Sequence, residues 1–365
     1  MSTIEVVDVF PIGIPLKTPL LWGAAGRIDR LEHAVVRVRT RDGVVGYGEA
    51  VPRPMIYGES LVSVVHALRD WFGPAVVGLN CHEPEKIVAA IETVAGNVSA
   101  KSALEMAAYD AASRSVGLPL RRYLGGWSDE VEVSYMLSLG SPEKMISEAA
   151  NIRNQTGIRA FKIKAGQNPV TDLQVVRDLR AELGPDAILY PDFNEQYDLH
   201  TAIRVIRQMS EYGIAWVEEP IPVTNRGQRV ALARAIPTPI LADDSATTLS
   251  EAAHEVAESV AGVLCIKIAR TGIHQSQRIV TVGAAFGVKS LVGGQGVTDL
   301  GTMHSAQFAA AYRDVIGPSD LGNFIKQTTF VLDDAPKIID GKLRLSDAPG
   351  GGFDLNEATL ARLAI

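Results

Sequence analysis

The chain has 365 residues, 47% of them hydrophobic and 21% charged, which is enough for two domains or for one large barrel with an addition. Its formal charge of −7 argues against nucleic acid and anionic lipid as partners, and no run approaches the roughly 18 apolar residues that a membrane span needs. Cys81 and Cys265 lie far apart and suggest no disulfide framework, which favours a cytoplasmic protein.

The first part of the chain predicts a small α+β domain. Strand patterns at 3–10, 34–39 and 44–49 are rich in β-branched residues, and the Asp-Gly pair at 42–43 predicts a hairpin. Apolar residues at three- and four-residue spacing then predict helices, and clusters of glycine and proline predict loops. The expected helices are 59–72, 84–95 and 100–116, and the expected loops are 19–26 and 52–58.

After residue 130, short apolar strands alternate with helical segments. This alternation predicts parallel strands joined by right-handed crossovers. A doubly wound open sheet is the alternative, but no Gly-x-Gly-x-x-Gly turn follows an early strand, and about eight regular units favour a barrel. The expected strands are 131–137, 159–164, 187–192, 214–218, 238–242, 262–268 and 288–292, with a weaker eighth near 313–318.

Two lysines stand at the end of the second barrel strand. Lys162 and Lys164 share one face of the strand, because successive side chains alternate between faces. Two ammonium groups on one face repel each other, and removal from water penalises the charged form further. Both effects lower the pKa of a lysine and favour a role as a proton acceptor.

Further charged residues end the next four strands, each about one strand–helix unit after the last. They are Asp192, Glu218, Asp243 and Lys267. The carboxyl ends of barrel strands meet at one mouth, so we expect these groups to converge. Three converging carboxylates require a compensating cation, and oxygen ligands without a matching histidine favour Mg²⁺ or Mn²⁺ over zinc. A solvated loop acid or a helix cap would explain Asp244, but not three acids in phase.

Five short motifs carry a family resemblance. They are Lys-x-Lys at 162–164, Asp-x-Asn at 192–194, Glu-Glu-Pro at 218–220, Ala-Asp-Asp-Ser at 242–245 and Ile-Lys-Ile-Ala-Arg-Thr-Gly at 266–272. With Gly-Tyr-Gly-Glu-Ala at 46–50, they resemble the enolase superfamily in its muconate-lactonizing-enzyme subgroup. The resemblance covers essentially the whole chain, and the five motifs in order at barrel spacing make it specific.

The resemblance implies an α/β fold, a (β/α)7β modified TIM barrel with an α+β capping domain. The implied capping domain is 1–126, the barrel with the active site is 127–320, and 321–365 returns to the cap. The implied Mg²⁺ ligands are Asp192, Glu218 and Asp243. Lys164 and Lys267 would act as acid and base on opposite faces of the substrate, with Lys162 tuning Lys164.

By the same resemblance, the substrate is a small carboxylate and the shared step moves a proton α to that carboxylate through an enolate. A muconate-type cycloisomerase is the favoured overall reaction. The alternatives are a racemase, epimerase or dehydratase of an amino-acid derivative (N-acyl, dipeptide, proline betaine or hydroxyproline) and an o-succinylbenzoate-synthase-like reaction. Asp320 keeps one acid of the Asp-x-Asp pair with which dipeptide epimerases hold an ammonium group, which counts against a dipeptide. Relatives also lead us to expect a homo-oligomer.

Substrate specificity should come from cap loops that close over the barrel mouth and from groups at strand ends. The candidates are Trp22, Ile56 and Tyr57 in the cap, and Asn194, Gln295 and Asp320 in the barrel. Simple packing between domains is an equal expectation for the cap residues. Two other classes stay open: a Schiff-base lyase, whose activity would survive EDTA, and a barrel that only binds a small acid.

Overall fold

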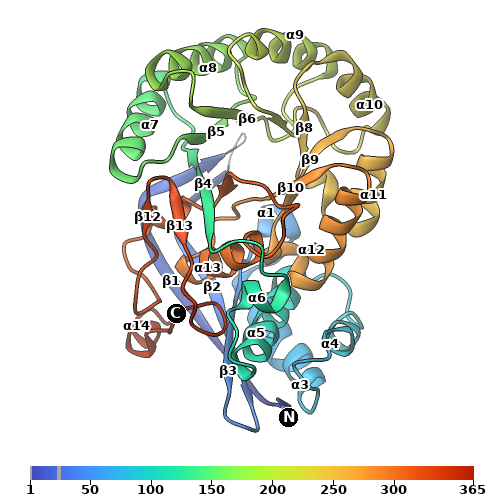
Figure 1. The fold of residues 1–365 in the computed structure, drawn as a ribbon, viewed down its shortest axis with the longest axis vertical. Helices are drawn as coiled ribbons and strands as arrows, with labels where there is room; N and C mark the ends of the chain where they lie inside the picture. Colours follow the sequence, from blue (N-terminus) through green and yellow to red (C-terminus); the bar gives the residue numbers. More distant parts are fainter. Residues whose placement is uncertain (1, 23–25) are drawn as a thin grey trace.

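The computed structural model of the protein describes residues 2–22 and 26–365. A three-stranded antiparallel sheet at the lower end of Figure 1 belongs to the cap, and a barrel of mostly parallel strands lies above it. No helix in the described ranges is long and apolar enough to cross a membrane. The cap sheet consists of β1 (Ile4–Trp22), β2 (Gly26–Thr40) and β3 (Val45–Ala50).

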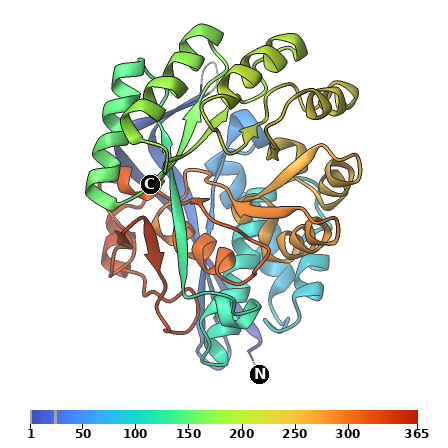
Figure 2. The ribbon, with the colours of Figure 1, turned by 45° about the horizontal axis from the view of Figure 1, so that its top comes forward.

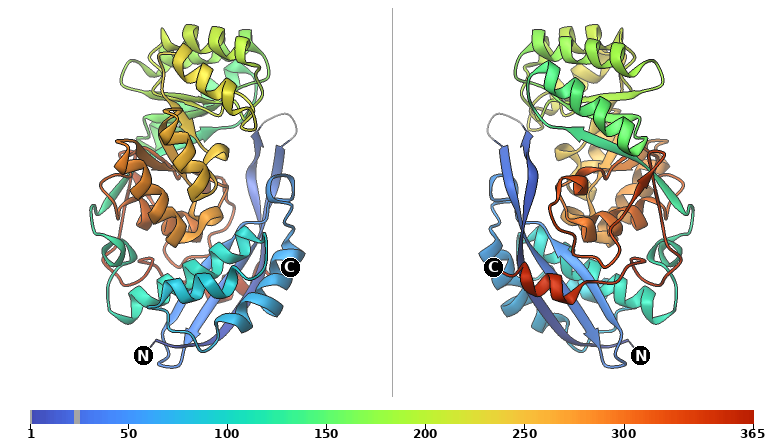
Figure 3. Two further views of the ribbon diagram at one scale, coloured as in Figure 1. Left: turned by 90° about the vertical axis from the view of Figure 1, so that its right-hand side faces the viewer. Right: turned by 90° about the vertical axis from the view of Figure 1, so that its left-hand side faces the viewer.

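The hairpin of β1 and β2 is longer than the sequence predicts. The prediction that a loop begins at residue 19 is wrong, because β1 continues to Trp22. It pairs with β2 through Leu20–Ile28 and Trp22–Gly26. The register shifts between Pro15 and Leu20, so the prolines interrupt the ladder without ending it. Residues 23–25 of that loop lie outside the described residues. Figure 3 shows this arm reaching up beside the barrel. Trp22, the last residue of β1, lines a cavity together with Lys164 and Lys267.

Helices cover one face of the cap sheet. A short helix occupies part of the loop expected at 52–58, and the helix expected at 59–72 is divided into an α-helical and a π-helical piece. The cap helices are α1 (Pro54–Tyr57), α2 (Leu61–His66), the π-helical η1 (Ala67–Phe72), α3 (Gly73–Val76), α4 (Pro84–Ile91), α5 (Val98–Ser115) and α6 (Leu120–Leu124).

Close contact between β3 and α5 explains two glycines of the 46–50 motif. A Cβ on Gly48 would lie 2.0 Å from the carbonyl oxygen of Ala103, and one on Gly46 would lie 2.2 Å from that of Ala107. Side chains at either position would push the strand off the helix, because such distances fall inside the van der Waals contact. These glycines therefore let the sheet and the buried helix pack backbone against backbone.

The predicted (β/α)7β barrel is confirmed. Eight strands alternate with seven helices that surround them (Figure 2), and β11 pairs with β4 to close the ring. The strands are β4 (Glu130–Leu137), β5 (Ala160–Lys164), β6 (Ile188–Asp192), β7 (Val217–Glu218), β8 (Ile240–Ala242), β9 (Ala261–Ile266), β10 (Lys289–Val292) and β11 (Ser319–Asp320). The helices are α7 (Pro142–Thr156), α8 (Pro169–Leu183), α9 (Leu199–Ser210), α10 (Arg226–Ala235), α11 (Leu249–Ala257), α12 (Ile268–Ala285) and α13 (Asp299–Ala309).

Several strand boundaries differ from the prediction, among them the starts of β7 and β8 and the positions of the sixth and eighth strands. The eighth strand lies at 319–320 instead of near 313–318, although Val315 still makes a parallel bridge with Ser290. The sixth strand ends at Ile266, so Lys267 stands between the strand and α12, at the N-cap position of the helix. Apolar runs extend past both ladders, and only the partner strands decide where the pairing ends.

The C-terminal tail returns to the cap. After the short η3 (Asn323–Lys326), β12 (Ile338–Ile339) and β13 (Lys342–Arg344) form a hairpin, and β13 pairs antiparallel with β4. The last helix, α14 (Glu357–Arg362), lies beside β1 in Figure 1. The N–H of Gly13 donates to the carbonyl of Leu363 at 2.9 Å, so the chain end is hydrogen-bonded to the first strand.

Two buried cap carboxylates bind the N-termini of barrel helices. Glu49 of β3 accepts hydrogen bonds from the N–H groups of Thr298 (2.9 Å) and Gly301 (2.7 Å), at the start of α13. Its other neighbour is His33, whose Nδ1 lies 2.5 Å from Glu49 Oε1. Glu105 of α5 accepts from the N–H of His274, after the kink in α12. Carboxylates suit these positions, because helix N-termini present free N–H groups and a positive dipole end.

We predict that Glu49→Ala lowers the free energy of unfolding by about 3–5 kcal/mol, because it leaves His33 and several buried N–H groups without their acceptor. Urea unfolding followed by circular dichroism measures the change. Glu5→Ala on the exposed part of β1 is the control and should change stability by less than about 0.5 kcal/mol. Equal effects of the two substitutions would contradict the role of Glu49.

Glu105 predicts a pH dependence of stability. Burial raises the pKa of Glu105 from 4.5 to about 7, even though backbone N–H groups at 273 and 274 lower it. The folded state therefore binds a proton that the unfolded state has released, and stability falls as the pH rises from 4.5 to about 7. Between these limits the free energy of unfolding of the wild type should fall by up to about 3 kcal/mol through Glu105, and Glu105→Gln should not show this fall. Parallel urea titrations of both proteins across this range test it, and identical pH slopes would contradict it.

Candidate active site

The predicted acids stand at the ends of three neighbouring parallel strands. Lys164 on β5 is in register with Asp192 on β6, and Asp192 is in register with Glu218 on β7. Asp243 follows β8 directly. The three carboxyl side chains are 1–3% exposed. The alternation of strand and helix thus brings together residues that are about 25 positions apart in the sequence, as a barrel mouth requires.

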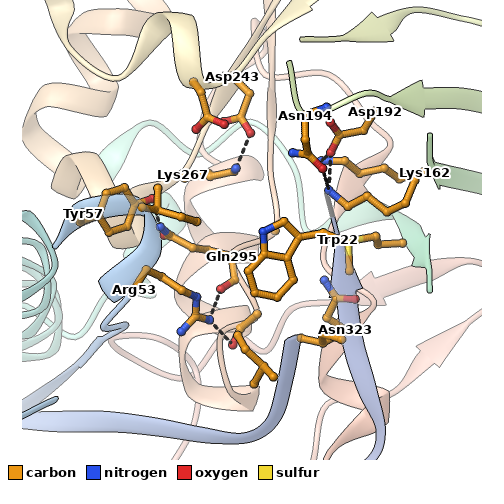
Figure 4. A pocket seen from close by; sticks show the side chains of 18 residues that line it. Trp22, Arg53, Tyr57, Lys162, Asp192, Asn194, Asp243, Lys267, Gln295 and Asn323 are labelled. Carbon is orange, nitrogen blue, oxygen red and sulfur yellow. Dashed lines mark hydrogen bonds and ion pairs between the residues drawn. The ribbon is translucent and has the colours of Figure 1, made fainter. Parts of the chain in front are cut away.

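One lysine pair lies against two of these acids. Lys164 Nζ is 2.5 Å from Asp192 Oδ2 and 2.9 Å from Asn194 Oδ1. Lys162 Nζ is 2.5 Å from Glu218 Oε1 and 3.2 Å from Asp192 Oδ2. Figure 4 shows Lys162, Asp192 and Asn194 together on one side of the pocket. Both lysines are buried, so each ammonium group replaces its lost hydration with carboxylate oxygens.

A second cationic group lies across the pocket. Lys267 Nζ forms an ion pair with Asp243 Oδ2, and the two residues stand together on the other side of the view in Figure 4. Arg270 Nη1 is 3.2 Å from Asp243 Oδ1 and 3.3 Å from Asp244 Oδ1. Asp243 therefore lies between a lysine and an arginine, which hold its pKa well below the usual range although burial raises it.

The acids reverse the expected effect on lysine acidity. Burial lowers the pKa of Lys162, but the carboxylates of Glu218 and Asp192 raise it well above the usual range. Asp243 likewise raises the pKa of Lys267 against the effect of burial. The lowered lysine pKa inferred from two neighbouring ammonium groups is therefore wrong at Lys162, because the sequence pattern counts the cations and overlooks acids on adjacent strands.

The acidic cluster suits one further hard cation. A carboxylate oxygen of Glu218, one of Asp243 and the sulfur of Cys265 lie within 4.8 Å of one another. Among the described residues, Glu218 Oε2 is buried without a hydrogen-bond partner. Burial and the charges of Asp192 and Asp243 raise the pKa of Glu218 although Lys162 lowers it, so a further cation beside this carboxylate would be favourable. Burial also raises the pKa of the Cys265 thiol, which leaves oxygen donors that fit Mg²⁺.

A cavity of about 90 Å³ opens beside these groups at the junction of cap and barrel. Of the six predicted specificity residues, five line it: Trp22, Ile56, Tyr57, Asn194 and Gln295. The sixth, Asp320, is 2% exposed and has Oδ2 3.9 Å from Lys162 Nζ, so it is buried behind the lysine. The cap thus covers the barrel mouth with aromatic and aliphatic groups, and Gln295 Nε2 donates to the Tyr57 hydroxyl.

The sequence reading missed Arg53, Met136 and Asn323, which also line the cavity. Arg53 is 8% exposed and donates to the carbonyl oxygens of Pro52 (2.7 Å) and Gln295 (2.5 Å), so it ties the cap to the loop after β10. Burial lowers the pKa of Arg53 to about 10. Its Pro-Arg-Pro context reads as an ordinary loop, and only tertiary contacts reveal the role.

The protein is thus a (β/α)7β-barrel protein with lysines and acids at successive strand ends and an α+β cap over the barrel mouth. Two family models match the chain, one for the cap and one for the barrel. The mandelate racemase/muconate lactonizing enzyme N-terminal domain matches residues 4–125, and the enolase C-terminal domain-like model matches residues 144–359. The chain belongs to the enolase superfamily, in its muconate-lactonizing-enzyme-like subgroup, and is an enzyme of that superfamily.

Individual relatives differ in their reactions. The L-Ala-D/L-Glu epimerase of Bacillus subtilis is 33% identical over 314 residues, which are 85% of each chain. A muconate lactonizing enzyme of Mycobacterium smegmatis complexed with muconolactone is 34% identical, with full coverage of both chains and a TM-score of 0.96. A dipeptide epimerase of Enterococcus faecalis complexed with Mg and L-Leu-L-Tyr is 28% identical, with 97% and 100% coverage and a TM-score of 0.92.

Proposed function

We propose that this protein catalyses the Mg²⁺-dependent removal or addition of a proton α to a carboxylate, through an enolate, with Lys164 and Lys267 as the acid/base pair. The main support for this proposal is that both lysines line one cavity from opposite sides. Lys164 forms an ion pair with the buried Asp192, and Lys267 forms one with the buried Asp243. Asp192, Glu218 and Asp243 are the proposed metal ligands. The Mg complex of the related dipeptide epimerase supports this choice of ion.

The chain's own groups divide the work. An α-proton of a carboxylate is a very weak acid, so the charge that develops on the substrate oxygens needs stabilisation as it forms. When bound, Mg²⁺ supplies that stabilisation electrostatically. Lys164 and Lys267 hold a proton at Nζ on either side of the cavity, and Lys162 keeps Asp192 and Glu218 in place through its two ion pairs. The cap side chains Trp22 and Ile56 exclude water from the mouth.

We favour a muconate-type cycloisomerase as the overall reaction. The similarity to the muconolactone complex extends over the full length of both chains. Asp320-Leu321-Gly322 offers one acid where a pair would hold an ammonium group, and a Cβ at Gly322 would lie 3.0 Å from Ser134 O and from a ring atom of Tyr135. A side chain at Gly322 would be crowded by these neighbours, and the glycine supplies no second carboxylate, which counts against an α-ammonium dipeptide.

A racemase or epimerase of an N-acyl amino acid is the second candidate, and the cavity wall supports it. Within the described part of the chain, two residues that line the cavity have a buried acceptor atom without a donor: Gln295 Oε1 and Asn323 Oδ1. Buried acceptors normally have a donor, so a substrate N–H or O–H would satisfy groups that a hydrocarbon chain would leave unpaired. The related epimerases show that this subgroup accommodates amino-acid derivatives.

We predict that Lys164→Ala and Lys267→Ala each lower turnover by at least about 100-fold, because each removes one proton carrier. Both variants should still bind Mg²⁺ in calorimetry, whereas Asp192→Ala should lose it. Lys144→Ala, on the exposed side of α7, is the matched control and should stay active. Full activity in either site-lysine variant would refute the two-lysine model. Activity that survives EDTA, with borohydride trapping, would favour a Schiff-base lyase instead.

The two candidate reactions predict different products. In D₂O with Mg²⁺, a cycloisomerase should consume cis,cis-muconate with loss of its conjugated-diene absorbance. An epimerase should leave the carbon skeleton of an N-succinyl or N-acyl amino acid intact, exchange its α-proton for deuterium and abolish its optical rotation. NMR of both mixtures tests the shared proton transfer and the overall reaction together. Exchange with neither class of substrate would contradict both candidates.

A further inference from the structure

The second acid of the Glu-Glu-Pro motif, Glu219, is turned toward the next strand. It is 1% exposed, and its Oε1 accepts hydrogen bonds from the N–H of Asp243 (2.7 Å) and from the N–H (2.9 Å) and hydroxyl (2.7 Å) of Ser245. Its side chain thus contacts the main chain of a proposed metal ligand directly. Glu218 and Glu219 are adjacent in sequence but serve different parts of the site.

A buried arginine holds the other oxygen of Glu219. Arg229 on α10 is 1% exposed, and its Nη1 lies 2.6 Å from Glu219 Oε2. Its Nη2 donates to Ser245 Oγ (2.7 Å) and Glu255 Oε2 (2.8 Å), and its Nε donates to Glu255 Oε1 (3.2 Å). The guanidinium is therefore held by two acids and a hydroxyl, a geometry that a planar five-donor group satisfies well. This network fixes Glu219 from behind.

The backbone at Glu219 reaches the third strand end. Its φ of +35° lies in the left-handed region, which is costly for a residue with a side chain and persists only where surrounding contacts enforce it. The carbonyl of Glu218 accepts from the N–H of Phe193 (3.0 Å), and that of Glu219 from the N–H of Glu195 (2.8 Å). The loops after β6, β7 and β8 are thereby joined at one residue, and each of these strand ends carries one proposed ligand.

We propose that Glu219, anchored by Arg229, is a positioning residue that sets the spacing of the three proposed Mg²⁺ ligands. The inference rests on the metal site of the proposed function. A site for a small divalent ion depends on fixed ligand positions, and groups that hydrogen-bond to the ligands from behind keep them in those positions. The side chain of Glu219 accepts a hydrogen bond from the peptide N–H of Asp243, and its main chain is bonded directly to Glu218. Glu219 therefore links two of the proposed ligands.

Glu219→Gln is the sharp test, because a neutral amide of the same size cannot satisfy this environment. Both oxygens of the Glu219 carboxylate face hydrogen-bond donors (Arg229 on one side, Asp243 and Ser245 on the other), so either orientation of the amide places its NH₂ group against a donor. We expect about a 10- to 100-fold weaker affinity for Mg²⁺, measured by calorimetry without substrate. Ser245→Ala, which removes one hydrogen bond to Glu219, should weaken it less.

Asp110→Asn is the matched control. Asp110 is also a buried carboxylate that accepts from backbone N–H groups, those of Tyr47 (2.9 Å) and Gly351 (2.6 Å), and from Arg114, but it lies in the cap. Its variant can lose stability yet should bind Mg²⁺ as the wild type does. This control separates lost positioning from general loosening of the fold.

The outcomes are distinct. A folded Glu219→Gln that binds Mg²⁺ as tightly as the wild type would overturn the positioning role while leaving the metal site standing. Equal weakening in Asp110→Asn would also overturn it. If Glu219→Gln failed to fold, unchanged affinity in Ser245→Ala would decide against the role. A wild-type protein that binds no Mg²⁺ would instead refute the proposed metal site itself.

Discussion

The convergence of like charges at the barrel mouth is the constraint on which the rest of the site depends. Asp192, Glu218 and Asp243 are nearly inaccessible to water, and buried carboxylates are costly without nearby positive charge. Lys164 and Lys267 supply part of that charge through direct ion pairs with Asp192 and Asp243. The lysines that we assign to chemistry therefore also make the acidic cluster tolerable in the folded protein, which ties stability and function to the same contacts.

The cap contributes order as well as cover. Glu49 and Glu105 project from the cap and bind α13 and α12, the helices that follow the loop after β10 and Lys267 respectively. Arg53 then holds that loop from the side of the cavity. Glu49, Glu105 and Arg53 thus join the cap to the barrel through buried hydrogen bonds. The same cap places Trp22 and Tyr57 at the cavity.

The two pairs of adjacent acids at the strand ends, Glu218-Glu219 and Asp243-Asp244, contain residues with different roles. In Glu218-Glu219, the first side chain enters the acidic cluster and the second binds Arg229 and the main chain of the next strand end. In Asp243-Asp244, the second acid lines the cavity and pairs with Arg270. At Glu218-Glu219 the two side chains leave the strand end in different directions, so this one motif can provide a ligand and its support.

The sequence by itself determined the alternating architecture and the order of the charged strand ends. Period and spacing are local properties, and parallel strands turn regular spacing into spatial convergence. Only the tertiary structure decided the rest. The raised pKa of Lys162, the interdomain contacts of Arg53 and the extension of β1 to Trp22 all depend on groups far away in the chain. Such effects come from burial and from partners on other strands, which no local pattern encodes.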